Sequence, residues 1–185
     1  GLLDPWSVGA TALIPGPEVT PAQLGLLMAR FDATIFAAAP GVYRQLLRAP
    51  MPALPHLRHG LSAGERLPEA LATAWQAATG RPVYEALGMS ECSTFISAAP
   101  GRPAPPGSSG FPQRGRRVAV LGPDAAPVPR GSPGTLAVSR RDPGLFLGYL
   151  HEPEETAARF AGEWFLTGDT VSMDADGAIT YLGRD

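Results

Sequence analysis

The run Trp-Phe-Leu-Thr-Gly-Asp at residues 164–169 ends in a carboxylate that directly follows a glycine. Gly168 would allow a ligand to approach the backbone closely, and the Asp169 carboxylate can accept hydrogen bonds from two hydroxyl groups at once. The two hydroxyls of a ribose are such a pair. We therefore predict that Asp169 lies in a turn after an aromatic strand and binds a ribose diol. The alternative is an ordinary Gly-Asp turn without a ligand.

A second candidate site is Gly-Met-Ser-Glu at residues 88–91, which follows a predicted strand at residues 82–85. In α/β sheets, ligands bind beyond the C-terminal ends of the parallel strands. There the Ser90 hydroxyl can bind a phosphate oxygen, and the Glu91 carboxylate can bind Mg2+. The alternative is a Ser-Glu pair that caps the start of a helix.

A third candidate, Ser-Ala-Gly-Glu at residues 62–65, also follows a predicted strand. Gly64 would let a flat ring lie against the backbone, and the alternative is a plain strand-to-helix turn. Cys92 is expected to be a small buried packing residue, because no histidine lies near it in the sequence. No metal-ligand spacing relates the three histidines, His56, His59 and His151.

The composition excludes some chemistry. The 15 basic residues are all arginine, so this chain contains no catalytic lysine and no lysine that could form a Schiff base. The formal net charge of −2 gives no reason to expect a nucleic-acid partner. A single cysteine cannot form an internal disulfide, which makes a reducing cytoplasm the default location. No apolar run is long enough to span a bilayer, and no signal peptide is visible.

The elements that must position these residues change in kind along the chain. The first half alternates strands with helices, which predicts a parallel sheet covered by helices on both faces. Its strands are predicted at residues 9–14, 33–37, 57–63 and 82–85, and its helices at about 20–31, 40–48 and 68–79. Four prolines between residues 100 and 107 end this half.

The second half consists of short segments with strand character. These are predicted at residues 117–121, 134–139, 162–166, 171–173 and 178–182, with one short helix at about 153–160. Asp-Ala-Asp-Gly at residues 174–177 predicts a hairpin turn. The predicted fold class is therefore α/β: a parallel α/β/α subdomain at residues 1–104, followed by a small distorted antiparallel β-barrel subdomain at 105–185.

The order and spacing of the motifs resemble those of the adenylate-forming superfamily, which includes acyl- and aryl-CoA synthetases, luciferases and peptide-synthetase adenylation domains. The resemblance covers essentially the whole chain. It rests on residues 62–65, 88–91, Gly148-Tyr149, 164–169 and Gly183-Arg184. Residues 36–40 and 85–88 are most similar to the benzoate and chlorobenzoate type of acid–CoA ligase. An acid–CoA ligase of this kind would use ATP, Mg2+ and CoA, and a small carboxylic acid as substrate.

The resemblance also implies a role for each matching residue. Ser90 and Glu91 would be catalytic, through contacts with the α-phosphate and with Mg2+. The other nucleotide-binding residues would be Gly64, Glu65, Glu85, Ala86, Leu87, Gly88, Asp169 and Arg184. Leu87 would replace an adenine-stacking tyrosine by aliphatic packing. The acid-binding residues would be Ala38, Ala39, Gly41 and Met89.

Two lysines of this superfamily have no counterpart here: one ends an upstream phosphate loop, and the other lies in a mobile C-terminal domain. We therefore expect the later part of the large N-terminal domain, ending near the hinge and inactive without the missing N- and C-terminal parts of the same enzyme. The alternatives are a non-catalytic nucleotide- or acyl-binding module and a peptide-synthetase adenylation domain. The second usually has an aspartate for the substrate amine where residues 36–41 are apolar. The thiol acceptor is either CoA or a carrier pantetheine.

Overall fold

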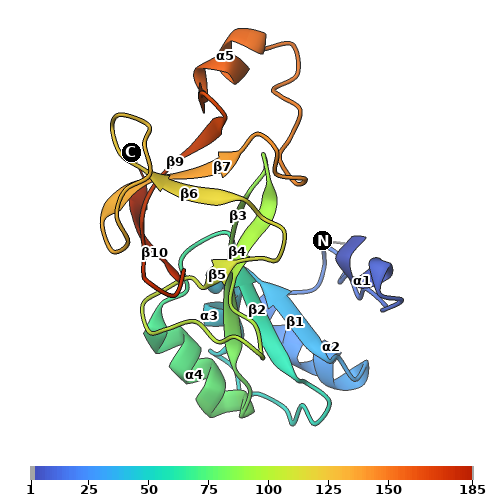
Figure 1. Ribbon diagram of the computed structural model, residues 1–185. Coiled ribbons are helices and arrows are strands. Elements are labelled where there is room, and N and C mark those ends of the chain that lie inside the picture. Colours follow the sequence, from blue (N-terminus) through green and yellow to red (C-terminus); the bar gives the residue numbers. More distant parts are fainter. Residues whose placement is uncertain (1–2, 185) are drawn as a thin grey trace.

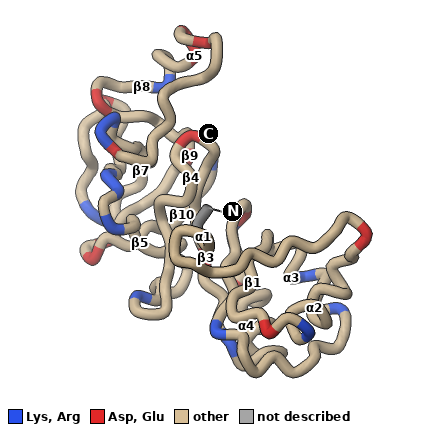
Figure 2. Tube along the Cα trace, turned by 90° about the vertical axis from the view of Figure 1, so that its right-hand side faces the viewer, with Lys and Arg blue, Asp and Glu red and all other residues tan. Residues whose placement is uncertain are grey.

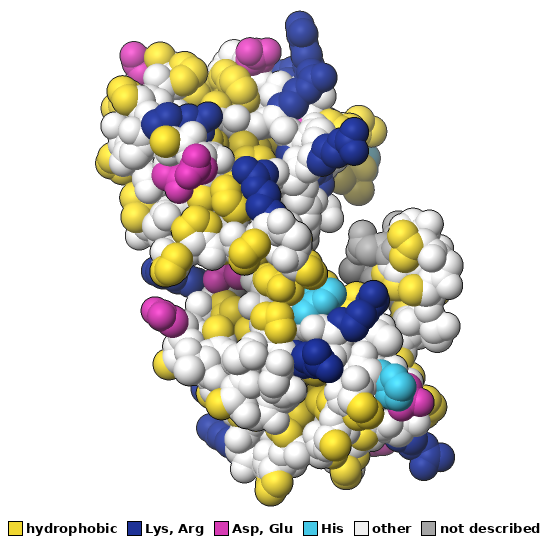
Figure 3. Space-filling model, turned by 60° about the horizontal axis from the view of Figure 1, so that its bottom comes forward, with side chains coloured by type: hydrophobic (Ala, Val, Ile, Leu, Met, Phe, Trp, Pro, Cys, Tyr) yellow, Lys and Arg dark blue, Asp and Glu magenta, His cyan; other side chains and the backbone are white. Residues whose placement is uncertain are grey.

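The computed structural model describes residues 3–184 and has two halves, each built around its own β-sheet (Figure 1). The predicted fold class is confirmed: an α/β half precedes a curled antiparallel sheet. Acidic and basic residues are spread over both halves (Figure 2). On the face seen in Figure 3, the arginines are dispersed among apolar and neutral groups and form no continuous basic surface.

The first half contains a five-stranded sheet with the order β1-β2-β3-β4-β5. Strands β1, β2 and β3 are parallel, whereas β4 and β5 run antiparallel to their neighbours, so the sheet is mixed and not purely parallel. The elements of this half are α1 (Leu3–Ser7), η1 (Pro21–Gln23), α2 (Leu24–Arg30), β1 (Ile35–Ala38), α3 (Pro40–Leu46), β2 (His59–Ala63), α4 (Glu69–Thr79), β3 (Val83–Met89), β4 (Ser93–Ser97) and β5 (Phe111–Pro112).

The core of the first half lies between one face of this sheet and the helices, around the fully buried Tyr43 and Trp75. The ring of Phe36, on β1, lies 5.1 Å from that of Tyr43 and 5.9 Å from that of Trp75. The Tyr43 hydroxyl donates to the backbone carbonyls of Phe36 and Leu61, each 2.9 Å away. Gly60 leaves the space that this hydroxyl occupies, because a Cβ there would collide with it. The helices are thereby fastened to the strands that carry the candidate loops.

Helices were predicted to cover both faces of the sheet. The opposite face is more exposed than this, since Ile35 on β1 is 41% exposed. The predicted strand at residues 9–14 is wrong: these residues form no strand, and Leu13 and Ile14 are exposed. A strand needs a neighbour that pairs with its backbone groups, so apolar composition alone does not form one, and Gly9, Ala10 and Ala12 have low strand propensity.

The second half contains a sheet with the order β10-β9-β7-β6, in which β8 also pairs with β9. Its elements are β6 (Val118–Leu121), β7 (Pro133–Ser139), α5 (Pro153–Ala158), β8 (Phe160–Ala161), β9 (Trp164–Met173) and β10 (Ile179–Arg184). The predicted hairpin turn at residues 174–177 is confirmed, because Asp174 Oδ1 accepts from Ala178 N at 2.8 Å and Gly177 has φ of 87°. The two strands predicted at 162–166 and 171–173 are instead one continuous strand, β9.

The two halves share one apolar core. Cys92, Phe95 and Ile96 of the β3–β4 hairpin pack with Phe165 and Ile179 of the second sheet. Backbone hydrogen bonds of 2.8 Å add to this contact, from Ser109 N to Ile179 O and from Ile179 N to Gly110 O. The hairpin that carries Ser90 and Glu91 is therefore fixed against the sheet that carries Asp169. The division at residue 104 stays a prediction.

Candidate functional site

Asp169 lies inside β9, and not in a turn after a strand as predicted. Thr135 of β7 pairs with Thr170, and Ala137 pairs with Leu166, so Leu136 alone faces residues 167–169. This bulge is closed by the buried Thr167 hydroxyl, which donates to Leu136 O at 2.8 Å and accepts from Asp169 N at 3.1 Å. Gly168 adopts φ of 78°, a conformation that favours glycine. The Thr-Gly-Asp sequence therefore builds a bulge that sets the direction of the Asp169 side chain.

Asp169 and Arg184, two of the predicted nucleotide-binding residues, lie together. They are paired across β9 and β10, and Arg184 Nε is 3.8 Å from Asp169 Oδ1. The Asp169 residue is only 8% exposed, whereas the Arg184 side chain is 62% exposed. This leaves a fixed carboxylate beside a solvent-exposed guanidinium, which suits a ligand with both hydroxyl and phosphate groups.

Ser90 and Glu91 lie in the turn between β3 and β4. They cap no helix, which removes the alternative considered from the sequence. Gly88 is needed here, because a Cβ would come within 2.6 Å of Ser93 O on the facing strand. The Ser90 side chain is exposed, and the half-buried Glu91 accepts a 2.7 Å hydrogen bond at Oε1 from the Tyr149 hydroxyl. The turn thus presents a hydroxyl and a carboxylate next to each other.

A buried ion pair between Arg116 and Asp142 supports this turn from the second half. Arg116 Nη2 donates to Cys92 O at 3.0 Å and to Thr94 O at 2.9 Å, just after the turn. Burial alone would raise the pKa of Asp142, but the backbone N–H groups of Arg117 and Gly144 and the Arg116 guanidinium bring it below the ordinary value. Asp142 is therefore ionised at neutral pH and keeps Arg116 in place.

Cys92 connects the two candidate regions. Its thiol is fully buried, and burial raises its pKa to about 12. Cys92 packs in the same apolar core as Phe165 and Val171 of β9, the strand that carries Asp169. The expectation of a buried packing cysteine is confirmed, and Cys92, next to Glu91, packs against the strand that carries Asp169.

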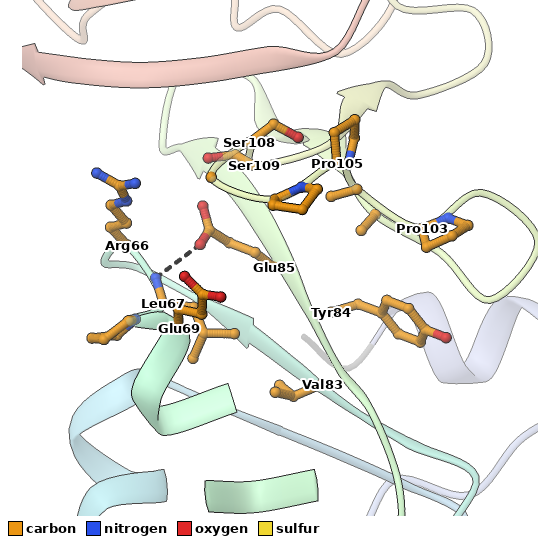
Figure 4. A pocket seen from close by; sticks show the side chains of 15 residues that line it. Arg66, Leu67, Glu69, Val83, Tyr84, Glu85, Pro103, Pro105, Ser108 and Ser109 are labelled. Carbon is orange, nitrogen blue, oxygen red and sulfur yellow. Dashed lines mark hydrogen bonds between the residues drawn. The ribbon is translucent and has the colours of Figure 1, made fainter. Parts of the chain in front are cut away.

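A cavity of about 630 Å3 lies on the first half, between the start of α4, β3 and the loop at residues 103–109 (Figure 4). Glu85 points into it, and its Oε2 accepts from Leu67 N at 2.8 Å. The Ser108 hydroxyl at its edge is buried and has no hydrogen-bond partner among residues 3–184. Of the predicted nucleotide-binding residues, Glu85 is the one that lines this cavity.

Comparison with known proteins gives this geometry its context. The family model for AMP-binding enzymes matches residues 1–150. The chain belongs to the AMP-binding enzyme family. The predicted resemblance to adenylate-forming enzymes, with benzoate-type acid–CoA ligases among its relatives, is thereby confirmed.

Three relatives are informative. A 3-hydroxybenzoate–CoA ligase of Aromatoleum sp. (strain CIB) is 34% identical over 95% of this chain and 34% of its own length. A benzoate–CoA ligase of Thauera aromatica is 33% identical over 100% of this chain and 35% of its own length. The crystal structure of an anthranilate CoA ligase in complex with anthranoyl-AMP matches with a TM-score of 0.85 and 36% identity, over 99% of this chain and 36% of that one. The chain thus spans about a third of the length of these relatives.

The other predicted nucleotide-binding residues lie on β3 or directly after β2. Gly64 has φ of 97° and, like Glu65, is exposed just after β2. Ala86 pairs with Ala63 on β2, whereas Leu87 packs against the core shared by the two halves. The side chain predicted to replace a stacking tyrosine is therefore partly used for packing.

The residues predicted to bind the acid fall into two places. Ala38, Ala39 and Gly41 lie at the end of β1 and the start of α3. Met89 lies at the end of β3 and packs against the core shared by the two halves. Ala38 packs against the separate core of the first half.

Sequence reasoning missed Arg116, Asp142 and the contact made by Tyr149. Gly148-Tyr149 is one of the motifs, but its distance from Glu91 along the sequence does not indicate that the two residues are in contact. Arg116 and Asp142 are single charged residues without a motif. Only the folded backbone brings them together.

The donor set near Glu91 fits a magnesium ion that is shared with a nucleotide. No group of three or more Asp, Glu, His or Cys residues within residues 3–184 could hold a metal on its own. Mg2+ typically binds one or two protein carboxylates together with substrate phosphates. Glu91 Oε2 has no hydrogen-bond or ion-pair partner in the described part of the chain, while Oε1 is bound by Tyr149. One oxygen of Glu91 is therefore available to a cation.

None of the helices that the structure describes could cross a bilayer, and α4 has only 11 residues.

Proposed function

We propose that this chain is part of an acid–CoA ligase, which joins a carboxylic acid to ATP to give acyl-AMP and pyrophosphate and then transfers the acyl group to the thiol of CoA. The observation that carries the proposal is the pairing of Asp169 with Arg184 across β9 and β10, in a chain of the AMP-binding family whose Glu91 hairpin packs against the same sheet. The relatives are named as ligases of this type.

Each candidate residue has one task in this proposal. Asp169 accepts hydrogen bonds from both ribose hydroxyls, and Arg184 approaches the ribose and phosphate. Ser90 donates its exposed hydroxyl to an oxygen of the α-phosphate. Two anions must meet in this reaction, and Mg2+, held by Glu91 and the phosphates, supplies the neutralising charge.

The base and the acid need separate places. Gly64, Glu65 and the β3 segment at residues 85–88 lie beside the base, and the cavity next to Glu85 offers volume for part of the nucleotide. The unpartnered Ser108 hydroxyl supports a polar ligand there. Ala38, Ala39, Gly41 and Met89 border the acid. Aromatic acids are the class to test first, because the relatives are named for benzoates and an anthranilate.

The reaction is expected to require parts of the enzyme beyond this chain. None of the 185 residues is a lysine, so no lysine here can hold the acid carboxylate against a phosphate oxygen. We propose that the missing N- and C-terminal parts of the same enzyme supply such contacts. A cytoplasmic location belongs to the same proposal and is supported by the single, free Cys92.

Acid-dependent ATP–pyrophosphate exchange tests the proposal. The full-length protein is expected to exchange pyrophosphate with at least one acid of an aryl and alkyl panel, and the isolated 185-residue chain is expected to be inactive. Turnover by the isolated chain would refute the need for further parts. A full-length protein that binds ATP but exchanges with no acid would favour a non-catalytic nucleotide-binding module. Exchange only with amino acids would favour a peptide-synthetase adenylation domain.

A further inference from the structure

The segment from Phe146 to α5 has no task in the proposed reaction, yet it contacts Glu91 twice. The Tyr149 hydroxyl donates to Glu91 Oε1 over 2.7 Å. From the same loop, Phe146 N donates to the backbone carbonyl of Glu91 over 2.6 Å. Both the side chain and the backbone of Glu91 are therefore held by residues that lie more than 50 positions later in the chain.

The Tyr149 ring is itself fixed. The Phe146 ring packs edge-on against it, with the ring centroids 4.9 Å apart. Tyr149 N donates to Thr156 Oγ1 at 2.9 Å, and the Thr156 hydroxyl donates to Glu152 O at 2.8 Å. Gly148, at φ of 151°, passes so close to Thr156 that a Cβ would lie 3.2 Å from its side chain. The start of α5 thus holds the loop, and the loop holds the carboxylate.

We propose that Tyr149 is a positioning residue for Glu91: it binds Oε1 and leaves Oε2 to a divalent cation that is shared with the nucleotide. The inference rests on the metal-binding role proposed for Glu91. A carboxylate that is already oriented loses less rotational freedom when a cation binds, so removing such an outer partner typically lowers metal affinity about 10- to 100-fold. The inference gives a task to the Gly-Tyr and Pro-Glu-Glu-Thr sequences at residues 148–149 and 153–156.

The test is the Tyr149→Phe variant of the full-length protein, which removes one hydroxyl and keeps the ring. Binding of Mn2+, measured by electron paramagnetic resonance with a non-hydrolysable ATP analogue present, is expected to weaken about tenfold. Tyr181→Phe is the matched control, because Tyr181 is half-buried and its hydroxyl has no hydrogen-bond partner within residues 3–184. Its Mn2+ affinity is expected to equal that of the parent protein.

A double-mutant cycle separates positioning from a general effect on the fold. Tyr149→Phe is expected to weaken Mn2+ binding in the parent and to change it less than about twofold in a Glu91→Ala background. Equal losses in both backgrounds, or no loss in the parent, would overturn the inference. If Glu91→Ala alone leaves Mn2+ affinity unchanged, both the inference and the metal role of Glu91 are refuted. If Glu91→Ala weakens binding and Tyr149→Phe does not, only the inference fails.

Discussion

Arg116 and Asp142 form a buried salt bridge, with 2.8 Å between Nη1 and Oδ1, and neither residue is part of the two apolar cores. The Asp142 side chain is completely buried, and that of Arg116 is 14% exposed. Arg116 Nη2 donates to the backbone carbonyls of Cys92 and Thr94. The salt bridge therefore joins the loop after β7 to the hairpin that carries Ser90 and Glu91. The geometry of the candidate site therefore depends on two residues that touch no ligand in the proposed reaction.

Replacing Asp142 by alanine should lower the free energy of unfolding by about 3–5 kcal/mol, because it leaves the Arg116 charge buried and unpaired. Urea denaturation measures the loss. Glu155→Ala is the control, since the Arg159–Glu155 pair is roughly half exposed and should contribute less than about 0.5 kcal/mol. Similar losses for the two variants would show that burial of the Arg116–Asp142 pair does not matter.

Acid should weaken the fold through the same carboxyl. The pKa of Asp142 is below its ordinary value of 3.8 in the folded chain, so the unfolded chain takes up this proton at a higher pH. The stabilisation is therefore complete above about pH 5 and is lost as the pH falls through 3.8 towards the lowered pKa. The free energy of unfolding, measured from about pH 6 to pH 2, should fall less steeply in Asp142→Asn than in the parent protein. Parallel slopes would contradict this.

Gly88→Ala should destabilise the chain by about 1–3 kcal/mol, because the new Cβ would come within 2.6 Å of Ser93 O and 2.8 Å of Thr94 Cα. Backbone atoms of a paired strand cannot move away without breaking the ladder. Thermal unfolding is the measurement, and Gly101→Ala is the control, because a Cβ at Gly101 meets nothing within 4 Å. An unchanged midpoint for Gly88→Ala would mean that the hairpin tolerates a wider spacing.

The Cys92 thiol should resist modification in the folded protein. Burial raises its pKa to about 12, so at pH 8 the reactive thiolate is on the order of a thousand times rarer than in an unfolded chain. A disulfide reagent such as Ellman's should therefore label native protein far more slowly than urea-unfolded protein. Rapid labelling without denaturant would show that the core around Cys92 opens readily.

Asp169→Ala in the full-length protein should weaken ATP binding at least about tenfold, because two hydrogen bonds from ribose hydroxyls to a carboxylate are lost. The bulge itself should persist, since it is closed by the Thr167 hydroxyl and the backbone N–H of residue 169. Calorimetric titration with ATP, beside an unfolding curve, distinguishes the two effects. Asp124→Ala, an exposed carboxylate of the same half, is the control, and unchanged ATP affinity in Asp169→Ala would refute the assigned role.

Local signals were sufficient to predict most of the fold. Proline at the first turn starts α3 at Pro40, and Gly80, at φ of 69°, ends α4. The errors occur where pairing with distant residues decides the structure. Strand β3 continues to Met89 because β4 pairs with it, and β9 continues through residues 167–169 because the Thr167 hydroxyl replaces a backbone partner. The segment at 9–14 is largely apolar, but no strand in the described chain pairs with it.

The candidate site was predictable to a similar extent. Motif order indicated Asp169 and Arg184, which the fold brings to adjacent strands, and it indicated the Ser90-Glu91 turn. It did not indicate Arg116 or Asp142, because a charged residue that supports a turn from another sheet follows no local pattern. The residues predicted to bind the acid are the least well supported, since Met89 and Ala38 pack against different apolar cores.

The hydrogen bond between Tyr149 and Glu91 closes a chain segment of 58 residues. A contact of that range contributes only after the ordering of the intervening loop has been compensated by other contacts. We therefore expect the Glu91 turn to acquire its final geometry late in folding, after each sheet has formed. Tyr149→Phe would then speed unfolding while leaving the folding rate unchanged. The residues of the candidate site would be the last to become ordered in folding and the first to lose their order in unfolding.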